Sequence, residues 1–319
     1  MKDECLICGA PLVYLDHDEM MECALCHKKE PSKCRCEKGH YVCSECHTKG
    51  IDSIFSICLA EISSDPIAIL NRLMALPFCH MHGPEHHILV GASLLTAYKN
   101  AGGKLDLERA LLEMQSRGRQ VPGGACGFWG ACGAGVSTGM FVSIVTGSTP
   151  LAGKEWGLSN RMTAAALNKI GEIGGPRCCK RDSYTALLAA VDFAEVELGV
   201  RMTPSRPLCT YSAKNNQCLG VKCPYSEAHA ERMKTLHKGS FKNRKALENS
   251  ERCGCFYCKR IYSPNEIERW LSEGDGTALC PHCGIDSVIA ENEEVILDET
   301  LLDAMHRYWF CAWNHSAQI

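Results

Sequence analysis

Apolar residues recur with helical spacing through the middle of the chain, from about residue 51 to about residue 235. The clearest case begins at Asp65, a typical N-cap residue, with Pro66 in the first helical position. One face of this predicted helix then carries Ile67, Leu70, Leu73 and Met74. We therefore expect an amphipathic helix that buries this face.

The same spacing predicts helices over His87–Asn100, Leu105–Gln115 and Ser159–Ile173, and Gly102-Gly103 would end the first of them. Asp182 is a predicted cap for one more helix, which buries Leu187, Leu188, Val191 and Ala194. The longest apolar run, Gly133–Ile144, is too short and too rich in Gly and Ser to cross a bilayer, so we expect it to be buried in protein. Because only short stretches alternate as strands do, the pattern predicts a mainly α central domain.

The two ends of the chain have a different pattern. Residues 1–50 are rich in Cys and His and poor in large aliphatic residues, so metal would have to stabilise their fold. Residues 236–319 open with a basic stretch, His237–Lys245, and then carry their own cysteine pairs. We predict an N-terminal double zinc-binding module (1–50), an α-rich core with Cys and His (51–235) and a C-terminal zinc-ribbon domain (236–319). The flanking zinc-ribbon and zinc-knuckle modules would contain small β hairpins.

The composition limits which cellular compartments and which binding partners we expect. The chain of 319 residues has 23 cysteines and a net charge of -3, so no overall basic excess indicates nucleic acid. The first residues lack the basic and apolar regions of a secretory signal, so we expect a cytoplasmic protein that is not a membrane protein. Reduced, closely spaced cysteines favour metal binding over the alternative, a secreted disulfide scaffold, and they suggest the cytoplasm of an anaerobe.

Cysteine pairs two residues apart predict the metal sites at the N-terminus. Cys5 and Cys8 form one such knuckle and Cys23 and Cys26 another, and we expect the two to close around one zinc ion, with iron as the alternative. A second cluster follows, with Cys34, Cys36, His40, Cys43, Cys46 and His47. Four of these would bind a second zinc, with the remainder supporting it or shared with the first site. The alternative for Cys43 and Cys46 is a redox pair.

The C-terminal segment repeats the ribbon pattern with Cys255, Cys258, Cys280 and Cys283, while Cys253 is a spare thiol. Two or three structural zinc ions are therefore expected in the whole chain.

The candidate chemistry of the central domain is scattered over several segments. Residues 78–87 include His82, His86 and His87, which we predict as proton-transfer or metal-binding residues, the alternative being a solvated loop that caps the next helix. His82 and His86 would share a helix face if the helix began early. The Gly-rich stretch 123–135 holds Cys126 and Cys132 and is predicted to approach a cluster or an anion, or otherwise to form a tightly packed turn.

Further thiols complete a candidate iron–sulfur site. Cys178 and Cys179 lie beside Arg177, a predicted carboxylate-binding residue, and because adjacent side chains point apart only one of the two should reach a shared site. The candidate ligands of a [4Fe–4S] cluster are Cys79, Cys126, Cys132, Cys178, Cys179, Cys218 and Cys223. Phosphate-loop and Rossmann motifs are absent from the sequence.

Several long motifs carry a resemblance. The stretches GHYVCSECH, CHMHGPEHH, GACGFWGACGAGVSTGMFVSIVTGSTPL and GPRCCKRDS resemble a cysteine-rich domain family of unknown function from anaerobic bacteria and archaea, over about residues 1–230. The stretches HKGSFKNR, CGCFYC, CPHCGIDSVI and MHRYWF resemble a small zinc-binding cytoplasmic protein family. The resemblance implies a fusion of two intracellular families without an established reaction.

Two classes of function remain open. The first is an iron–sulfur enzyme, a lyase or a sulfur-transfer enzyme, acting on a small or sulfur-containing substrate, by analogy with iron–sulfur amino-acid lyases and desulfidases. The second is a non-catalytic zinc-ribbon module that binds nucleic acid or protein through Lys238, Lys242, Arg244 and Lys245, unless these residues form only a solvated surface. Metal or sulfur trafficking without turnover is a further alternative.

Overall fold

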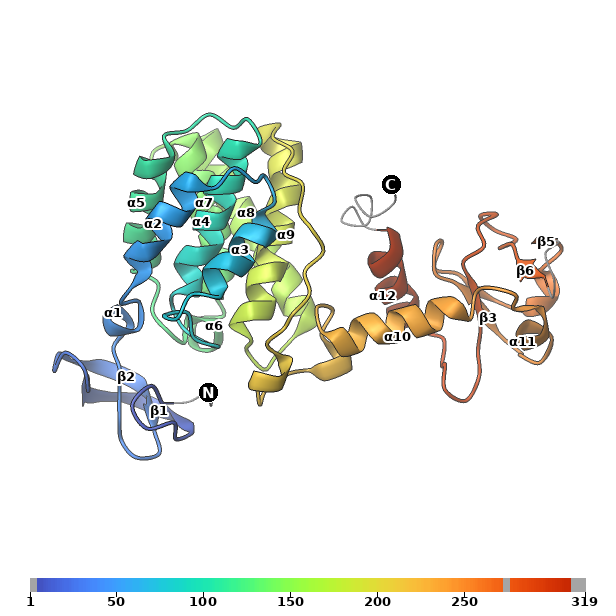
Figure 1. The fold of residues 1–319 in the computed structure, drawn as a ribbon, viewed down its shortest axis with the longest axis horizontal. Coiled ribbons are helices and arrows are strands. Elements are labelled where there is room, and N and C mark those ends of the chain that lie inside the picture. The colour runs from blue at the N-terminus through green and yellow to red at the C-terminus, as the bar shows by residue number, and fades with distance from the viewer. Residues whose placement is uncertain (1–4, 272–275, 311–319) are drawn as a thin grey trace. The chain divides into compact units, whose positions relative to one another are not determined.

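The computed structural model describes residues 5–271 and 276–310, and the chain divides after Cys218 into two compact units, unit 1 and unit 2. Unit 1 contains a small β hairpin followed by a bundle of helices, and unit 2 contains small sheets together with helices (Figure 1). The expectation of a mainly α core flanked by small zinc-ribbon-like modules is confirmed. The three-segment boundaries predicted from the sequence stay a prediction. Among the described residues, no helix is both long and apolar enough to span a bilayer.

Unit 1 begins with an antiparallel hairpin. Strand β1 (Leu12–Glu22) pairs with β2 (Lys29–Cys36), and the register shifts between Tyr14 and Glu19. Most side chains of both strands are partly or fully exposed, so the hairpin has almost no apolar core of its own. The short helix α1 (Ser44–His47) follows it.

The bundle of unit 1 is formed by helices between residues 51 and 198. They are η1 (Ile51–Ser53), α2 (Ile54–Ala60), α3 (Pro66–Met74), α4 (His86–Asn100), α5 (Leu107–Gly118), α6 (Ala125–Phe128), α7 (Gly133–Thr146), α8 (Lys154–Ile173) and α9 (Cys179–Leu198). An extended segment with the short η2 (Ser212–Lys214) completes the unit.

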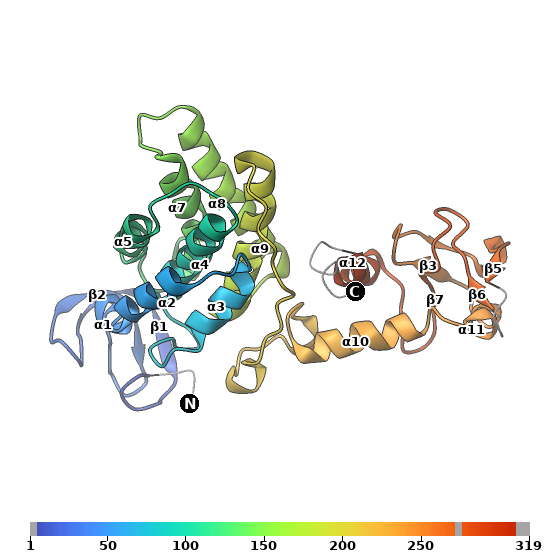
Figure 2. The same cartoon turned by 45° about the horizontal axis from the view of Figure 1, so that its top comes forward.

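Helix α4 lies at the centre of the bundle. Every residue from His86 to Tyr98 is buried, and α3, α5, α7 and α9 pack around it (Figure 2). Helix α7 packs closely on α8 because Gly135 faces Leu167 and Gly139 faces Thr163, with no room for a Cβ at either glycine. The apolar run predicted to be buried, Gly133–Ile144, forms most of α7, whose small residues permit this close packing.

The helix caps are partly as predicted. Asp65 Oδ1 accepts hydrogen bonds from the backbone N–H groups of Ile67 (2.9 Å) and Ala68 (3.1 Å) and so caps α3. The prediction that Asp182 caps a helix is wrong, because α9 already begins at Cys179. Asp182 lies inside the first turn and accepts a hydrogen bond from the backbone N–H of Cys178.

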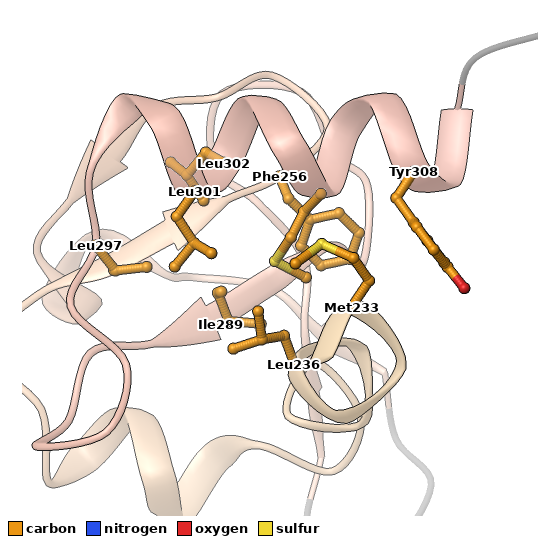
Figure 3. Close-up of a cluster of buried hydrophobic side chains, with 9 residues drawn as sticks. Met233, Leu236, Phe256, Ile289, Leu297, Leu301, Leu302 and Tyr308 are labelled. Carbon is orange, nitrogen blue, oxygen red and sulfur yellow. The ribbon is translucent and has the colours of Figure 1, made fainter. Parts of the chain in front are cut away.

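Unit 2 is built on a three-stranded antiparallel sheet of order β4-β3-β7. Its elements are η3 (Gly220–Lys222), α10 (Glu227–Lys238), α11 (Arg244–Glu248), β3 (Cys253–Cys255), β4 (Ile261–Tyr262), η4 (Pro264–Glu266), β5 (Trp270–Leu271), β6 (Thr277–Ala278), β7 (Val288–Ala290) and α12 (Glu299–Phe310). Side chains of α10, α12 and the sheet meet in one apolar core, in which Met233, Phe256 and Leu302 are almost fully buried (Figure 3).

Candidate metal centres and the central cavity

Two ligand sets occupy the N-terminal part of unit 1, and they interleave along the sequence. One set is Cys5, Cys8, Cys36 and His40, and the other is Cys23, Cys26, Cys43 and Cys46. The expectation that the first two knuckles share one ion is therefore wrong. Strand β1, with 11 residues, separates these knuckles, and a strand of that length spans about 35 Å. Each knuckle instead meets ligands brought to its end of the hairpin, as the pairing of Leu12 with Cys36 shows.

The distances within these sets match the geometry of a single bound ion. The Sγ atoms of Cys26 and Cys43 lie 3.7 Å apart, and those of Cys8 and Cys36 lie 3.9 Å apart. Tetrahedral thiolates at ~2.3 Å from a zinc ion are about 3.8 Å apart, whereas a disulfide would bring the sulfurs to about 2 Å. His40 presents Nδ1, which lies 3.2 Å from Cys8 Sγ and 3.5 Å from Cys36 Sγ.

A common backbone turn shapes the knuckles. The residue after the second cysteine has a positive φ in four cases, at Gly9, His27, Lys259 and Gly284. Its N–H donates to the carbonyl of the first cysteine, for example from Gly9 to Cys5 at 2.8 Å. This turn points both thiols the same way, so the ligand geometry is fixed locally by the chain.

Unit 2 holds a third set, formed by Cys255, Cys258, Cys280 and Cys283 as the sequence predicts. The Sγ atoms of Cys255 and Cys283 are 3.7 Å apart, as are those of Cys258 and Cys280. Cys253 is outside the set, since its thiol lies 3.4 Å from the carbonyl oxygen of Tyr262. The three sets could thus hold one metal ion each, and none of the cysteines in the described part of the chain forms a disulfide.

Two members of the predicted second cluster belong to neither N-terminal set. Cys34 lies beside Tyr14 and Arg177, and its burial raises the pKa of its thiol. His47 follows Cys46 on α1 but turns away from it toward Glu85, with Nδ1 3.5 Å from Glu85 Oε2.

A cavity of about 1130 Å³ lies within unit 1. One wall comes from the hairpin and α1, and the others come from residues 79–87, the Gly-rich stretch around α6, and the first turns of α7 and α9. The predicted residues that it brings together are Cys79, His82, His86, His87, Cys126, Cys132, Arg177 and Cys179.

Three predicted cluster ligands do not line the cavity. Cys178 is buried behind it, where its Sγ accepts a hydrogen bond from Asn215 Nδ2 at 3.4 Å. Cys218 ends unit 1, and Cys223 belongs to unit 2. The adjacent pair Cys178 and Cys179 therefore points two ways, with only Cys179 at the cavity.

Three of the cavity thiols come from separate helical segments. Cys126 lies on α6, Cys132 is the N-cap of α7, and Cys179 begins α9. Burial and the nearby Asp182 carboxylate raise the pKa of Cys132 to about 12, and burial raises that of Cys179 well above its ordinary value. Thiolates at these positions therefore need a positively charged partner.

The histidines of residues 79–87 have different surroundings. Helix α4 begins at His86, so His82 lies in the preceding turn and the two do not share a helix face. His86 Nδ1 lies 3.1 Å from the Gly83 carbonyl, which leaves Nε2 facing Cys79 Sγ at 3.7 Å. His87 Nδ1 lies 3.1 Å from the carbonyl of Val121. Burial first, and then nearby Arg177, lowers the pKa of His82 to about 4.

Two charged residues of the site were not singled out from the sequence. Glu85 is completely buried, and Lys180 is only 1% exposed with Nζ 3.2 Å from Cys79 Sγ and 4.6 Å from the centre of the Tyr211 ring. A glutamate before a helix and a lysine between other cations usually occupy solvated positions. The burial of Glu85 and Lys180 could therefore not be predicted from residue type. Their burial follows from the packing of α4 and α9.

Comparison with known proteins identifies a family for the helical core. No curated protein and no solved structure matches the chain. The family model described as "Family of unknown function (DUF5714)" matches residues 54–226, which is more than half of the chain and covers the helical bundle but not the hairpin. The chain therefore belongs to this family of unknown function, DUF5714.

Proposed function

We propose that this protein is a metal-dependent enzyme whose substrate is a small, negatively charged molecule bound in the central cavity. The observation that carries the proposal is the convergence of separate segments on one cavity, with thiols, imidazoles and cations on its walls. Arg177 and Lys180 supply positive charge there, and a guanidinium is well suited to hold a carboxylate or a similar anion.

Cys126, Cys132 and Cys179 are the proposed ligands of an iron–sulfur cluster. These thiols face one cavity, but they are not among the described ligand groups tight enough for a single ion, and a cluster separates its ligands more widely. A [4Fe–4S] cluster bound by three thiols keeps one iron free to act as a Lewis acid on the substrate. The histidine at position 82 lines the same cavity and would exchange a proton with the bound molecule.

The three four-ligand sets are proposed to be structural zinc sites in a reducing compartment, as in a cytoplasmic protein. All four positions of each set are filled by protein atoms, which is typical of structural zinc and leaves no open position for chemistry. The absence of disulfides among the described cysteines supports reduced thiols.

Anaerobic purification with measurement of iron, sulfide and visible absorption tests the cluster. We expect a brown protein, and we expect Cys179→Ala to lose most of the iron and sulfide while Cys178→Ala keeps them. The two variants form a matched pair, because the thiols are adjacent in sequence and only Cys179 faces the cavity. Iron-free wild-type protein, or equal loss in both variants, would contradict the proposal.

A second candidate function rests on one surface of unit 2. Phe241 is 60% exposed, Lys242 Nζ lies 5.3 Å from the centre of its ring, and Lys238 and Lys245 are exposed nearby in sequence. An exposed aromatic ring among lysines is typical of surfaces that stack on single-stranded nucleic acid. Binding of a labelled RNA oligonucleotide should then weaken steeply with salt, and Phe241→Ala should reduce it about tenfold. RNA binding that is equal in the wild type and the variant would count against this surface.

A further inference from the structure

Three polar atoms in unit 1 face one another without hydrogen-bond partners. They are Nδ1 of His47, Nδ1 of His80 and Oε2 of Glu85. The Glu85 carboxylate is completely buried, and burying a carboxylate oxygen without a partner is costly. These residues come from two places, His47 from α1 and the others from the turn before α4.

The spacing of these atoms fits shared coordination better than hydrogen bonding. His47 Nδ1 lies 3.5 Å from Glu85 Oε2, the proposed ligand oxygen, whereas His80 Nδ1 lies 3.4 Å from Oε1, the other oxygen of the same carboxylate. One ligand atom from each of the three residues lies within 4.8 Å of the other two. Charged hydrogen bonds would bring such atoms to about 2.7–2.9 Å. Nitrogen and oxygen ligands at ~2.0–2.1 Å from one tetrahedral ion are about 3.4 Å apart.

We propose that His47, His80 and Glu85 bind a divalent transition-metal ion of the zinc class. Two imidazoles and one carboxylate form a ligand set typical of catalytic zinc, in which a fourth position is left for water or substrate. The imidazoles are 20% and 25% exposed and line the central cavity, so the open position faces it. The site is distinct from the three four-ligand sets and from the proposed iron–sulfur cluster.

The backbone holds the carboxylate in place for this role. Glu85 Oε1 accepts a hydrogen bond of 2.8 Å from the backbone N–H of His80, which leaves Oε2 free to bind the ion. Gly83 makes room for the group, because a Cβ at this position would overlap the Glu85 carboxylate. Cys46, directly before His47, belongs to the second four-ligand set and so fixes α1 close to the site.

A second group of possible ligands, on the other side of Glu85, is a weaker candidate for a metal site. Cys79, Glu85 and His86 also lie close together, but the Lys180 ammonium is 3.2 Å from Cys79 Sγ and already supplies positive charge there. His86 Nδ1 is satisfied by the Gly83 carbonyl. The unpartnered atoms therefore single out the group with two histidines.

Metal content of the full-length protein tests the site. After zinc loading and removal of loosely bound ions, we expect about four zinc ions per chain in the wild type. His80→Ala and Glu85→Gln should each hold about one fewer, while the exposed residue change His17→Ala should leave the content unchanged. Iron measured in the same samples should not change, so failure of the proposed cluster remains distinguishable.

Cobalt spectroscopy provides a readout that does not depend on a stoichiometry alone. Co²⁺ added to protein with three zinc ions bound should give visible ligand-field bands without a thiolate charge-transfer band, and these bands should be missing in His80→Ala. Near-UV circular dichroism should show that His80, which is partly exposed, can be replaced without unfolding the protein. Equal zinc content in the wild type and both variants, absence of cobalt binding, or a charge-transfer band from Cys79 would overturn the proposal.

Discussion

Gly254 on β3 lies against Leu302 on α12 in the core of unit 2. A Cβ at Gly254 would approach both Leu302 methyl carbons to 3.1 Å, which is tighter than ordinary packing. The leucine is fully buried, so its side chain has little freedom to move away. At the scale of single residues, these two positions are therefore coupled.

We predict that Leu302→Ala lowers the free energy of unfolding of unit 2 by about 2–5 kcal/mol and that Gly254→Ala lowers it by about 1–3 kcal/mol. The double variant should lose less than the sum, because the new methyl group occupies part of the cavity. Urea unfolding of the four proteins, monitored by hydrogen exchange in unit 2, measures this coupling. Strict additivity would show that the two residues do not share the space.

At the scale of elements, the cap of α3 connects two distant segments. Asp65 Oδ1 accepts hydrogen bonds from two N–H groups of the helix and also from the N–H of Ser205, at 3.0 Å. Asp106 caps α5 with a single bond to Arg109 N–H and is exposed. The two aspartates thus perform the same local role in different surroundings.

Asp65→Ala should reduce the free energy of unfolding of unit 1 by about 2 kcal/mol, and Asp106→Ala by about 0.5–1 kcal/mol. The difference arises because the first change also leaves the Ser205 N–H without its partner. Thermal or urea unfolding followed by far-UV circular dichroism compares the two. If both variants lost the same stability, the bond to Ser205 would contribute nothing.

The elements show how far the sequence alone leads. The 3.6-residue period predicted the central helices, and the Asp-Pro pair predicted the start of α3. The partners of Cys5 and Cys23 were misassigned because β1 was not recognised. Its side chains are mostly exposed, and its apolar and polar residues occur in runs, so no alternation of apolar side chains marks the strand. The proposed metal site that includes Glu85 was not predicted for a similar reason, since the burial of Glu85 depends on contacts between segments that are distant in sequence.

At the scale of the whole molecule, metal and apolar packing stabilise different parts. The bundle buries a continuous set of apolar side chains around α4, whereas the hairpin of unit 1 buries few residues besides cysteines. The sheet of unit 2 has both a four-cysteine set and an apolar core. Removal of metal should therefore affect the three regions unequally.

We predict that a strong chelator with a thiol reagent unfolds residues 5–47 while most helical signal of the bundle persists. Hydrogen exchange read by mass spectrometry should show loss of protection in the hairpin first, and far-UV circular dichroism should retain the helix bands. Zinc added after reduction should restore protection. Simultaneous loss of hairpin and bundle would mean that the bundle also depends on metal.

The interleaved ligand sets carry a consequence for how the protein matures. The set that begins with Cys5 and Cys8 is complete only when His40 has been synthesised, and the set that begins with Cys23 and Cys26 only when Cys46 has been synthesised. The last ligands of the two sets therefore emerge within a few residues of each other. Until then, the nascent chain exposes reduced thiols whose metal-ligand sets are incomplete. Both ligand sets are therefore completed at nearly the same, early point of synthesis, and a nascent segment that ends before His40 would lack ligands for both ions.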